Sequence, residues 1–155
     1  MNSSRGGSGT LNTGIPAAVH AAFDRWLAAL ATREGGDALD AAVAAACSDS
    51  VVVELHGFHA ARGTVTATLC GGREVATWSA RAPAQTRFWL DGAIAAVDAG
   101  WRARYRLEID EFVNGGWWTL WLADDGRISR LAHAPDDLPD HLVSPPGSVV
   151  IGGDS

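Results

Sequence analysis

The second half of the chain consists of β-rich runs separated by turn signals, and this pattern constrains the fold more than any other feature. The runs cover residues 86–97, 101–113, 117–123 and 127–134. The turn signals between them are Asp98-Ala99-Gly100, Asn114-Gly115 and Asp125-Gly126. Asn-Gly and Asp-Gly favour the type I′ turns that match strand twist, so the pattern predicts tight antiparallel hairpins. Because long twisted strands coil, we expect one face of the sheet to be concave.

The first half of the chain has helical spacing. The stripe formed by Val19, Phe23, Trp26, Leu27 and Leu30 predicts a helix over 15–33, with Pro16 in its first turn. A second helix is expected over 38–47, capped by Asp37.

Shorter elements connect these helices to the hairpins. We expect a turn at 48–50, a strand at 51–56 and a possible short strand at 64–69. A third, short helix over 73–81 has Trp78 on its inner side and ends before Pro83.

Length and charge limit the function classes. A chain of 155 residues is the size of one ordinary domain. The net charge of −6, without a basic stripe, argues against a nucleic-acid partner. No run of about 18 apolar residues is present, so no membrane association is expected. Seven tryptophans indicate a thick core, an apolar cavity wall or a subunit interface.

The cysteines and the termini suggest a cytoplasmic protein with one central domain. Cys47 and Cys70 form no CxxC motif, so both are interpreted as reduced thiols. Residues 1–14 are polar and glycine-rich, are expected to be disordered, and lack the apolar stretch of a signal peptide. Residues 136–155 are rich in proline and are expected to form an irregular tail after a domain at 15–135.

The order of elements resembles the NTF2-like superfamily, and within it the SnoaL-like proteins. The resemblance spans 15–135 and is carried by four passages: Ser48 to Gly57, Arg62-Gly63, the Arg73–Pro83 helix, and Ala123 to Ile128. It implies an α+β cone, with N-terminal helices packed on a curved antiparallel sheet that encloses a pocket. The superfamily includes ketosteroid isomerases, polyketide cyclases, dehydratases, epoxide hydrolases and members without known chemistry, so the fold alone does not define function. Its members are commonly dimers through the outer sheet face, which implies a homodimer here.

Glu54 is the first candidate catalytic residue, because it is a carboxylate within a strand of valines. The resemblance implies a basic role, since ketosteroid-isomerase-like members carry their basic aspartate at this position relative to Gly57. A carboxylate in an apolar pocket has a raised pKa and can transfer protons near neutral pH. The alternative is that Glu54 points to solvent from the other face of the strand.

His133 is the second candidate, five residues beyond Ile128. SnoaL-like cyclases carry an acid/base aspartate at the matching position, and a histidine could serve there because its pKa lies near 7. The alternative is a histidine hydrogen-bonded at a strand end.

Alternating charges on the strand at 101–113 form the third feature. Period two places one set on each face. The charged set is Arg102, Arg104, Arg106, Glu108 and Asp110, and the opposite set is Ala103, Tyr105, Leu107 and Ile109. Arg106 and Glu108 resemble the arginine–carboxylate pair of the superfamily's epoxide hydrolases. The alternative, which we prefer, is a solvated or dimer-facing ladder of cross-strand ion pairs.

Asp91 interrupts the apolar run before it and needs a partner if buried. Arg104 on the neighbouring strand is the expected partner, in either a structural or a pocket role. Trp118 falls near the oxyanion-hole acid of the isomerases, and its indole could donate one hydrogen bond. Tyr105, the only tyrosine, could orient a ligand or pack in the core.

The first functional hypothesis is an enzyme that acts by general acid/base catalysis on an apolar small molecule. His133 and Glu54 would transfer protons, while Asp91 and Arg104 orient them. The expected substrate-binding residues are His56, Trp118, Tyr105, Trp89 and Trp26. No cofactor and no metal is expected, because the sequence has no P-loop, GxGxxG, HExxH or GxSxG motif. The second hypothesis is a non-catalytic small-molecule-binding or dimerisation module with the same fold.

Overall fold

The computed structural model describes residues 14–32 and 35–137. Three α-helices and seven strands follow one another in the described part. In chain order they are α1 (Ala17–Ala31), α2 (Gly36–Ala46), β2 (Cys47–His56), the 3₁₀ helix η2 (His59–Ala61), β3 (Val65–Cys70), α3 (Gly72–Ala80), β4 (Arg87–Leu90), β5 (Ala95–Val97), β6 (Gly100–Ile109), β7 (Phe112–Leu122) and β8 (Ile128–Pro135).

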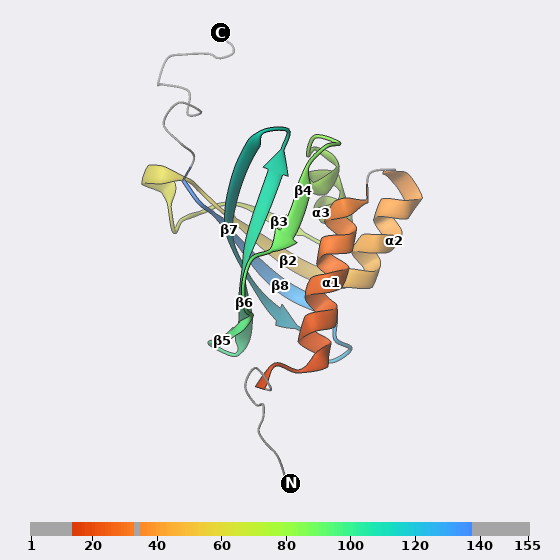
Figure 1. Cartoon of the computed structure of the whole chain (residues 1–155). Coiled ribbons are helices and arrows are strands. Elements are labelled where there is room, and N and C mark those ends of the chain that lie inside the picture. The colour runs from red at the N-terminus through yellow and green to blue at the C-terminus, as the bar shows by residue number, and fades with distance from the viewer. Residues whose placement is uncertain (1–13, 33–34, 138–155) are drawn as a thin grey trace.

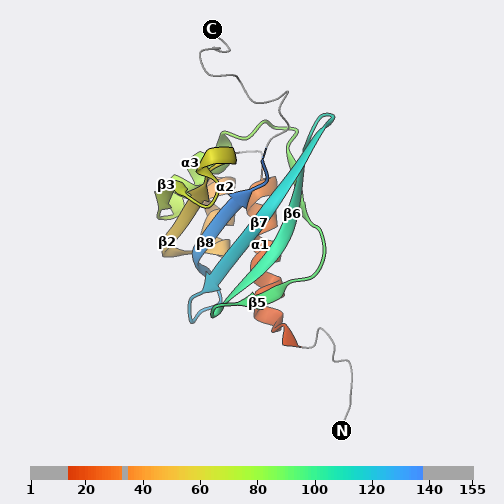
Figure 2. The same cartoon turned by 90° about the vertical axis from the view of Figure 1, so that its left-hand side faces the viewer.

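The seven strands form one curved, unclosed sheet, and all three α-helices lie on one side of it (Figures 1 and 2). The strand order is β3-β2-β8-β7-β6-β4, with β5 also paired to β6. Every neighbouring pair is antiparallel except β2 and β8, which run parallel. The predicted α+β fold class, with helices packed on a curved sheet, is confirmed.

The core lies between the helices and the inner face of the sheet. α1 contributes Phe23 and Trp26, and the sheet contributes Tyr105, Trp118 and Leu120, all fully buried. Alternation along β6 follows the predicted period of two, because Ala103 and Tyr105 are buried while Arg104, between them, lies on the other face. The sheet therefore has an aromatic inner face and a charged outer face.

The predicted turn at Asn114-Gly115 is wrong. The two-residue loop of this hairpin is Asp110-Glu111, with Asp110 at φ 55°, and both glycines at 115 and 116 lie inside β7. A Cβ on Gly115 would lie 2.6 Å from the backbone oxygen of Tyr105, and one on Gly116 would lie 2.6 Å from that of Ala134. These glycines therefore mark a close approach of strands rather than a turn.

Three other local predictions need correction. The run 86–97 is broken by a bend at 91–94, where Gly92 has a φ of 106°, so it forms two short strands. Residues 48–50 belong to β2, whose pairing with β8 is irregular at this point, and do not form a turn. The residue before α2 is Gly35, with Asp37 in the first helical turn rather than at the cap.

The other two turn predictions are confirmed. Asp98 and Ala99 both have positive φ, 39° and 65°, and join β5 to β6. Gly126 has a φ of 87° between β7 and β8, and its N–H donates to the carbonyl of Ala123. The sheet therefore turns at two of the three positions that the sequence indicates.

The terminal predictions fall mostly outside the described residues, namely at 1–13 and 138–155. Asp136 and Asp137 are described, and their carboxylates are ion-paired to Arg104 and Arg62. These two residues are thus held against the domain, whereas the sequence assigned them to an irregular tail. Among the helices described, none has the length and apolar character needed to cross a bilayer.

Replacing Gly116 with alanine is expected to destabilise the protein by about 1–3 kcal/mol, because the new Cβ would collide with two strands. Its nearest neighbours would be the backbone of Ala134 and Pro135 and the Tyr105 hydroxyl, all within 2.7 Å. Urea unfolding measures the change. Gly14→Ala is the control, since nothing lies within 4 Å of its Cβ position. Equal stability of the two variants would contradict the proposed close approach.

Candidate functional site

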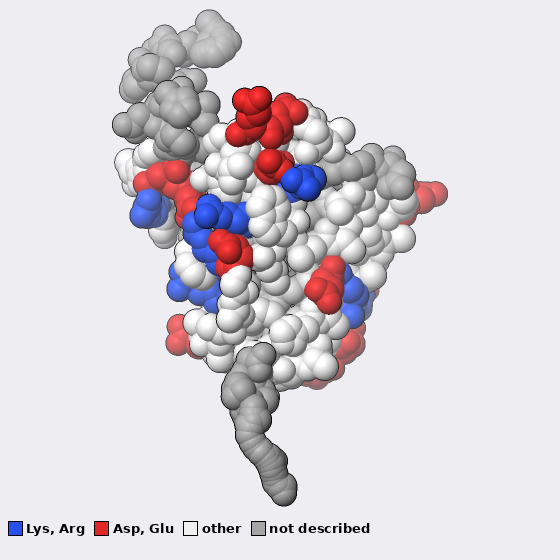
Figure 3. Space-filling model, viewed as in Figure 1, with Lys and Arg blue, Asp and Glu red and all other residues white. Residues whose placement is uncertain are grey.

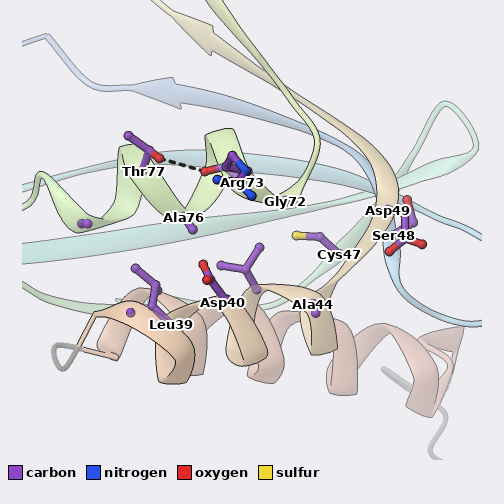
Figure 4. A pocket seen from close by; sticks show the side chains of 13 residues that line it. Leu39, Asp40, Ala44, Cys47, Ser48, Asp49, Gly72, Arg73, Ala76 and Thr77 are labelled. Carbon is purple, nitrogen blue, oxygen red and sulfur yellow. Dashed lines mark hydrogen bonds between the residues drawn. The ribbon is translucent and has the colours of Figure 1, made fainter.

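One hollow, with a volume of about 460 Å³, lies between α2 and α3 (Figure 4). Leu39, Val43 and Ala76 line it, and Asp40 points from α2 towards α3. Burial raises the pKa of the Cys47 thiol, which faces this hollow, to about 12, so it stays protonated at neutral pH. The lining residues include no aromatic ring and none of the predicted site residues, so we do not assign the site here.

The second hollow, of about 310 Å³, is the candidate site. It lies where α1 and α3 meet the start of β4, and its walls are mostly apolar. The lining residues are Leu30, Trp78, Ser79, Arg81, Ala82 and Phe88. Its volume is at the lower end of the range for small-molecule sites.

Two of its walls belong to a larger aromatic cluster, defined here as Trp26, Trp78, Phe88, Tyr105, Trp118 and His133. Trp78 stacks on Trp26, with ring centroids 6.4 Å apart, and meets His133 edge-on at 5.5 Å. Phe88 packs against Tyr105 and Trp118 at 6.1 and 5.9 Å. The rings of Trp78 and Phe88 thus separate the candidate site from the polar atoms of the cluster.

His133 is the polar centre of the cluster, and both of its ring nitrogens are engaged. The indole N–H of Trp118 donates to Nδ1 at 3.0 Å, and Nε2 lies 3.2 Å from the Tyr105 hydroxyl oxygen. An indole can only donate, so Nδ1 must be the acceptor and the neutral ring carries its proton on Nε2. The Nε2–H then donates to Tyr105.

The environment of His133 keeps the ring neutral. Burial, with a smaller contribution from the charge of His56, lowers the pKa of His133 from 6.5 to about 4. His133 itself is only partly buried, but both of its hydrogen-bonding partners are fully buried. Protonation of Nδ1 would also break the bond from Trp118. At neutral pH the ring of His133 is therefore neutral, with both nitrogens in hydrogen bonds.

Two donors of the cluster are left without an acceptor among the described residues. The Tyr105 hydroxyl receives the Nε2–H of His133, and its own proton has no acceptor there. Burial raises the pKa of Tyr105, so the hydroxyl keeps that proton. The indole N–H of Trp26 is also buried and unpaired. Unsatisfied buried donors are costly, and an acceptor brought by a ligand would satisfy them.

Glu54 does not lie in the candidate site. In the parallel pairing of β2 with β8, Glu54 lies opposite Ala132, and the next pair is Leu55 and His133. Because successive side chains of a strand point to opposite faces and His133 points inward, Glu54 lies on the outer face of the sheet. Its Oε1 accepts from the Nη2 of Arg130 at 3.0 Å. The solvent-facing alternative is the observed one, because the register gives Glu54 and His133 opposite faces.

Asp91 and Arg104 also lie outside, and they do not form the expected pair. Asp91 is half-exposed and accepts from the Nε of Arg106 at 3.1 Å. Arg104 Nη1 donates to Asp136 at 2.8 Å, and this bond holds the pKa of Asp136 below its usual value. The prediction of an Asp91–Arg104 pair is wrong because Asp136, at the end of β8, offers Arg104 a bidentate carboxylate instead.

The charges on β6 form a ladder of ion pairs on the outer face. Glu108 pairs with Arg87 across the β4–β6 register. Arg106 pairs with Asp91, so Arg106 and Glu108 do not act together as an arginine–carboxylate pair. In Figure 3 acidic and basic side chains lie intermingled on the left of the molecule. The geometry agrees with the preferred interpretation of an ion-pair ladder.

The predicted substrate-binding residues divide between the two faces. Trp26, Trp118 and Tyr105 lie in the aromatic cluster, whereas Trp89 is 39% exposed, with the Arg87 guanidinium 5.8 Å from its ring. His56 lies near enough to His133 to affect its pKa. The roles of these residues stay predictions.

Sequence reasoning did not select Trp78 and Phe88 as site residues. The sequence did contain information that could have identified both. Trp78 was expected on the inner side of the third helix, and Phe88 lies in the apolar run that Asp91 interrupts. In the described ranges no three His, Cys, Asp or Glu side chains converge as they would at a metal site.

No protein-family model and no curated protein matches the sequence. Solved structures do match. A SnoaL-like family protein from Agrobacterium tumefaciens has a TM-score of 0.63 at 20% identity, over 78% of this chain and 99% of that one. An LEH-like epoxide hydrolase from M. tuberculosis has a TM-score of 0.51 at 26% identity, over 75% and 76%. A computationally designed 17-OHP binder has a TM-score of 0.57 at 13% identity, over 77% and 91%.

NTF2-like proteins and a ketosteroid isomerase homologue are also among the matching structures. The similarity covers helices and sheet together, in agreement with the curved sheet and the helices on one face. The chain therefore has the NTF2-like fold, in the form found in SnoaL-like proteins.

Proposed function

We propose that the protein binds a small, mostly apolar molecule that carries a hydrogen-bond acceptor, in the pocket beside Trp78 and Phe88. One observation carries this proposal. The apolar pocket is walled by two rings, and directly behind them lie donors without an acceptor among the described residues, on Tyr105 and Trp26. On this proposal, Trp78 or Phe88 rotates away from the cluster on binding, so that a carbonyl or ether oxygen of the ligand reaches these donors.

Binding is favoured over acid/base catalysis by the positions of the charged groups. Glu54, Asp91 and Arg104 form ion pairs on the outer face of the sheet. The remaining candidate, His133, is held neutral between two buried partners. A designed protein of this fold is a 17-OHP binder, which supports the use of the fold for binding small molecules.

A cofactor-free enzyme of the SnoaL-like type is the second candidate. One feature favours it, namely that the tyrosine hydroxyl and the imidazole form a hydrogen-bonded pair in the interior. Such a pair could polarise a substrate carbonyl by donation from Tyr105, with His133 as its support. Turnover of a bound ketone that is abolished in Tyr105→Phe would favour this candidate over simple binding.

Filling the pocket is expected to weaken binding at least 10-fold. Ala82 lines the pocket, so Ala82→Trp places an indole in the space that the ligand needs. Ala84→Trp is the matched control, because Ala84 is exposed and does not line the pocket. Two probes, a cyclic ketone and the hydrocarbon of the same shape, are titrated into the protein. Binding is followed by the change in tryptophan fluorescence.

The ketone is expected to bind the wild-type protein and the Ala84 variant more tightly than the hydrocarbon does, since only the ketone has an acceptor. Equal affinity of both variants for the ketone would place the site elsewhere. Equal affinity of ketone and hydrocarbon would remove the role of the buried donors.

Lowering the pH is expected to destabilise the protein through His133. Its folded pKa of about 4 lies below the ordinary 6.5, so the unfolded chain binds the proton more tightly. The resulting stability is present above pH 6.5 and is lost as the pH falls towards 4, by up to roughly 3 kcal/mol. Urea unfolding at pH 7, 5.5 and 4.5 measures this loss.

His133→Asn should reduce the dependence of the unfolding free energy on pH in this window. His20→Gln, at an exposed position on α1, is the control and should leave this dependence unchanged. Asp136 and Asp137 have pKa values below 3.8, so their contributions are lost only at lower pH. An unchanged slope in His133→Asn would show that His133 is not the titrating group.

The expected homodimer is also a proposal. In the related families the outer face of the sheet commonly forms such contacts. In this chain that face is occupied by its own ion pairs and by Arg102, whose guanidinium lies 4.1 Å from the ring centroid of Trp117. A dimer through this face would have to desolvate those charges.

A further inference from the structure

The pocket beside Trp78 and Phe88 contains a charged side chain at one end. Arg81 follows the last residue of α3 and lines the pocket together with Ser79, whereas the other lining side chains are apolar. Arg81 lies three residues after Trp78, so the two side chains share one side of the helix. The N–H of Arg81 donates to the carbonyl of Trp78 at 3.1 Å, a bond of the last helical turn. The pocket therefore extends from an aromatic ring to a guanidinium.

Both polar side chains of this pocket are available to a ligand. Arg81 is exposed, and within the described ranges no carboxylate forms an ion pair with it. By contrast, Arg104 and Arg106 on the outer face of the sheet are each paired with an aspartate. Ser79 is only 4% exposed, and its hydroxyl has no hydrogen-bond partner in the part of the chain that is described. A buried hydroxyl without a partner is costly, and a ligand oxygen would satisfy it.

We propose that the ligand of this pocket is an apolar molecule with a carboxylate at one end and a neutral oxygen acceptor at the other. The carboxylate binds the Arg81 guanidinium and the Ser79 hydroxyl at the end of α3. The neutral acceptor reaches the buried donors on Tyr105 and Trp26, which have no acceptor among the described residues. This inference rests on the ligand-binding function proposed above and defines the chemical class of the ligand.

The two ends of the pocket suit different oxygen atoms. A guanidinium presents parallel N–H groups that match the two oxygens of a carboxylate. Tyr105 and Trp26 are neutral donors, since burial raises the pKa of Tyr105, and they suit a carbonyl or ether oxygen. One guanidinium beside mostly apolar walls balances a single negative charge, which favours a carboxylate over a doubly charged phosphate. The net charge of the chain is −6, so an anion needs a local cation such as Arg81 to be attracted here.

A purely structural role of Arg81 leads to a different expectation. A cation at the C-terminal end of a helix is stabilised by the unpaired carbonyl groups there. In that role Arg81 affects the free energy of unfolding and gives the pocket no preference for the charge of a ligand. The preference for a charged over a neutral ligand therefore separates the two roles.

Three probes built on one cyclic ketone test the inference. Opposite the carbonyl they carry a carboxylate, its methyl ester or an ammonium group. Each is titrated into the full-length protein by calorimetry, and urea unfolding measures the stability of each variant. Arg81→Gln removes the charge and Arg81→Glu reverses it. Arg73→Gln is the matched control, because Arg73 is an exposed arginine of α3 that does not line this pocket.

The acid is expected to bind the wild type and Arg73→Gln roughly 5-fold more tightly than the ester, because a charge-assisted bond at a partly exposed site is worth about 1 kcal/mol. Added salt should reduce this difference. Arg81→Gln should bind acid and ester equally, and Arg81→Glu should prefer the ammonium probe. Ser79→Ala should reduce the preference for the acid.

Equal affinity of acid and ester for the wild type overturns the carboxylate, while the ligand pocket stands if Ala82→Trp still weakens the binding of both. A preference for the acid that survives in Arg81→Gln overturns the role of Arg81, and a loss of stability in that variant would then identify it as a helix-terminal charge alone. Acid binding that Ala82→Trp leaves unchanged, or a wild type that binds no probe, contradicts the proposed function itself.

Discussion

The hydrogen bond from Trp118 to His133 determines how the interior of this protein can be used. It places the imidazole proton on Nε2, which directs the ring towards Tyr105 and leaves the tyrosine proton without an acceptor among the described residues. It also opposes protonation of His133, because Nδ1 is already an acceptor, and burial lowers the pKa of His133 in the same direction. A group that would otherwise titrate near neutral pH thereby becomes a fixed part of an aromatic wall.

The two faces of the sheet divide the chemistry between them. The inner face, under the helices, carries rings, neutral donors and a small apolar pocket. The outer face carries the charged groups, already paired with one another. Of the groups considered for proton transfer, the described residues place only His133 on the inner side, where its pKa is lowered to about 4, and the charged residue that lines the pocket is Arg81. The arrangement suits recognition of an apolar molecule by its shape and by one acceptor.

Much of the fold could be predicted from local signals, because the helical stripe of α1 and the period-two alternation of β6 each report a buried face directly. The site was harder to predict, because the inward or outward direction of Glu54 depends on its register with β8, about 80 residues away. Gly115 was misassigned to a turn for a related reason. A glycine that permits a turn and one that permits close strand packing look the same until the partner strand is known.

The protonation of His133 at neutral pH is the most direct test of the account. Nitrogen-detected NMR of the histidine side chains, with Trp118→Phe to assign the signal, distinguishes the two neutral tautomers and the imidazolium. The account predicts a neutral ring with the proton on Nε2 and an Nδ1 resonance that shifts when the indole donor is removed. An imidazolium at pH 7, or a proton on Nδ1, would contradict it.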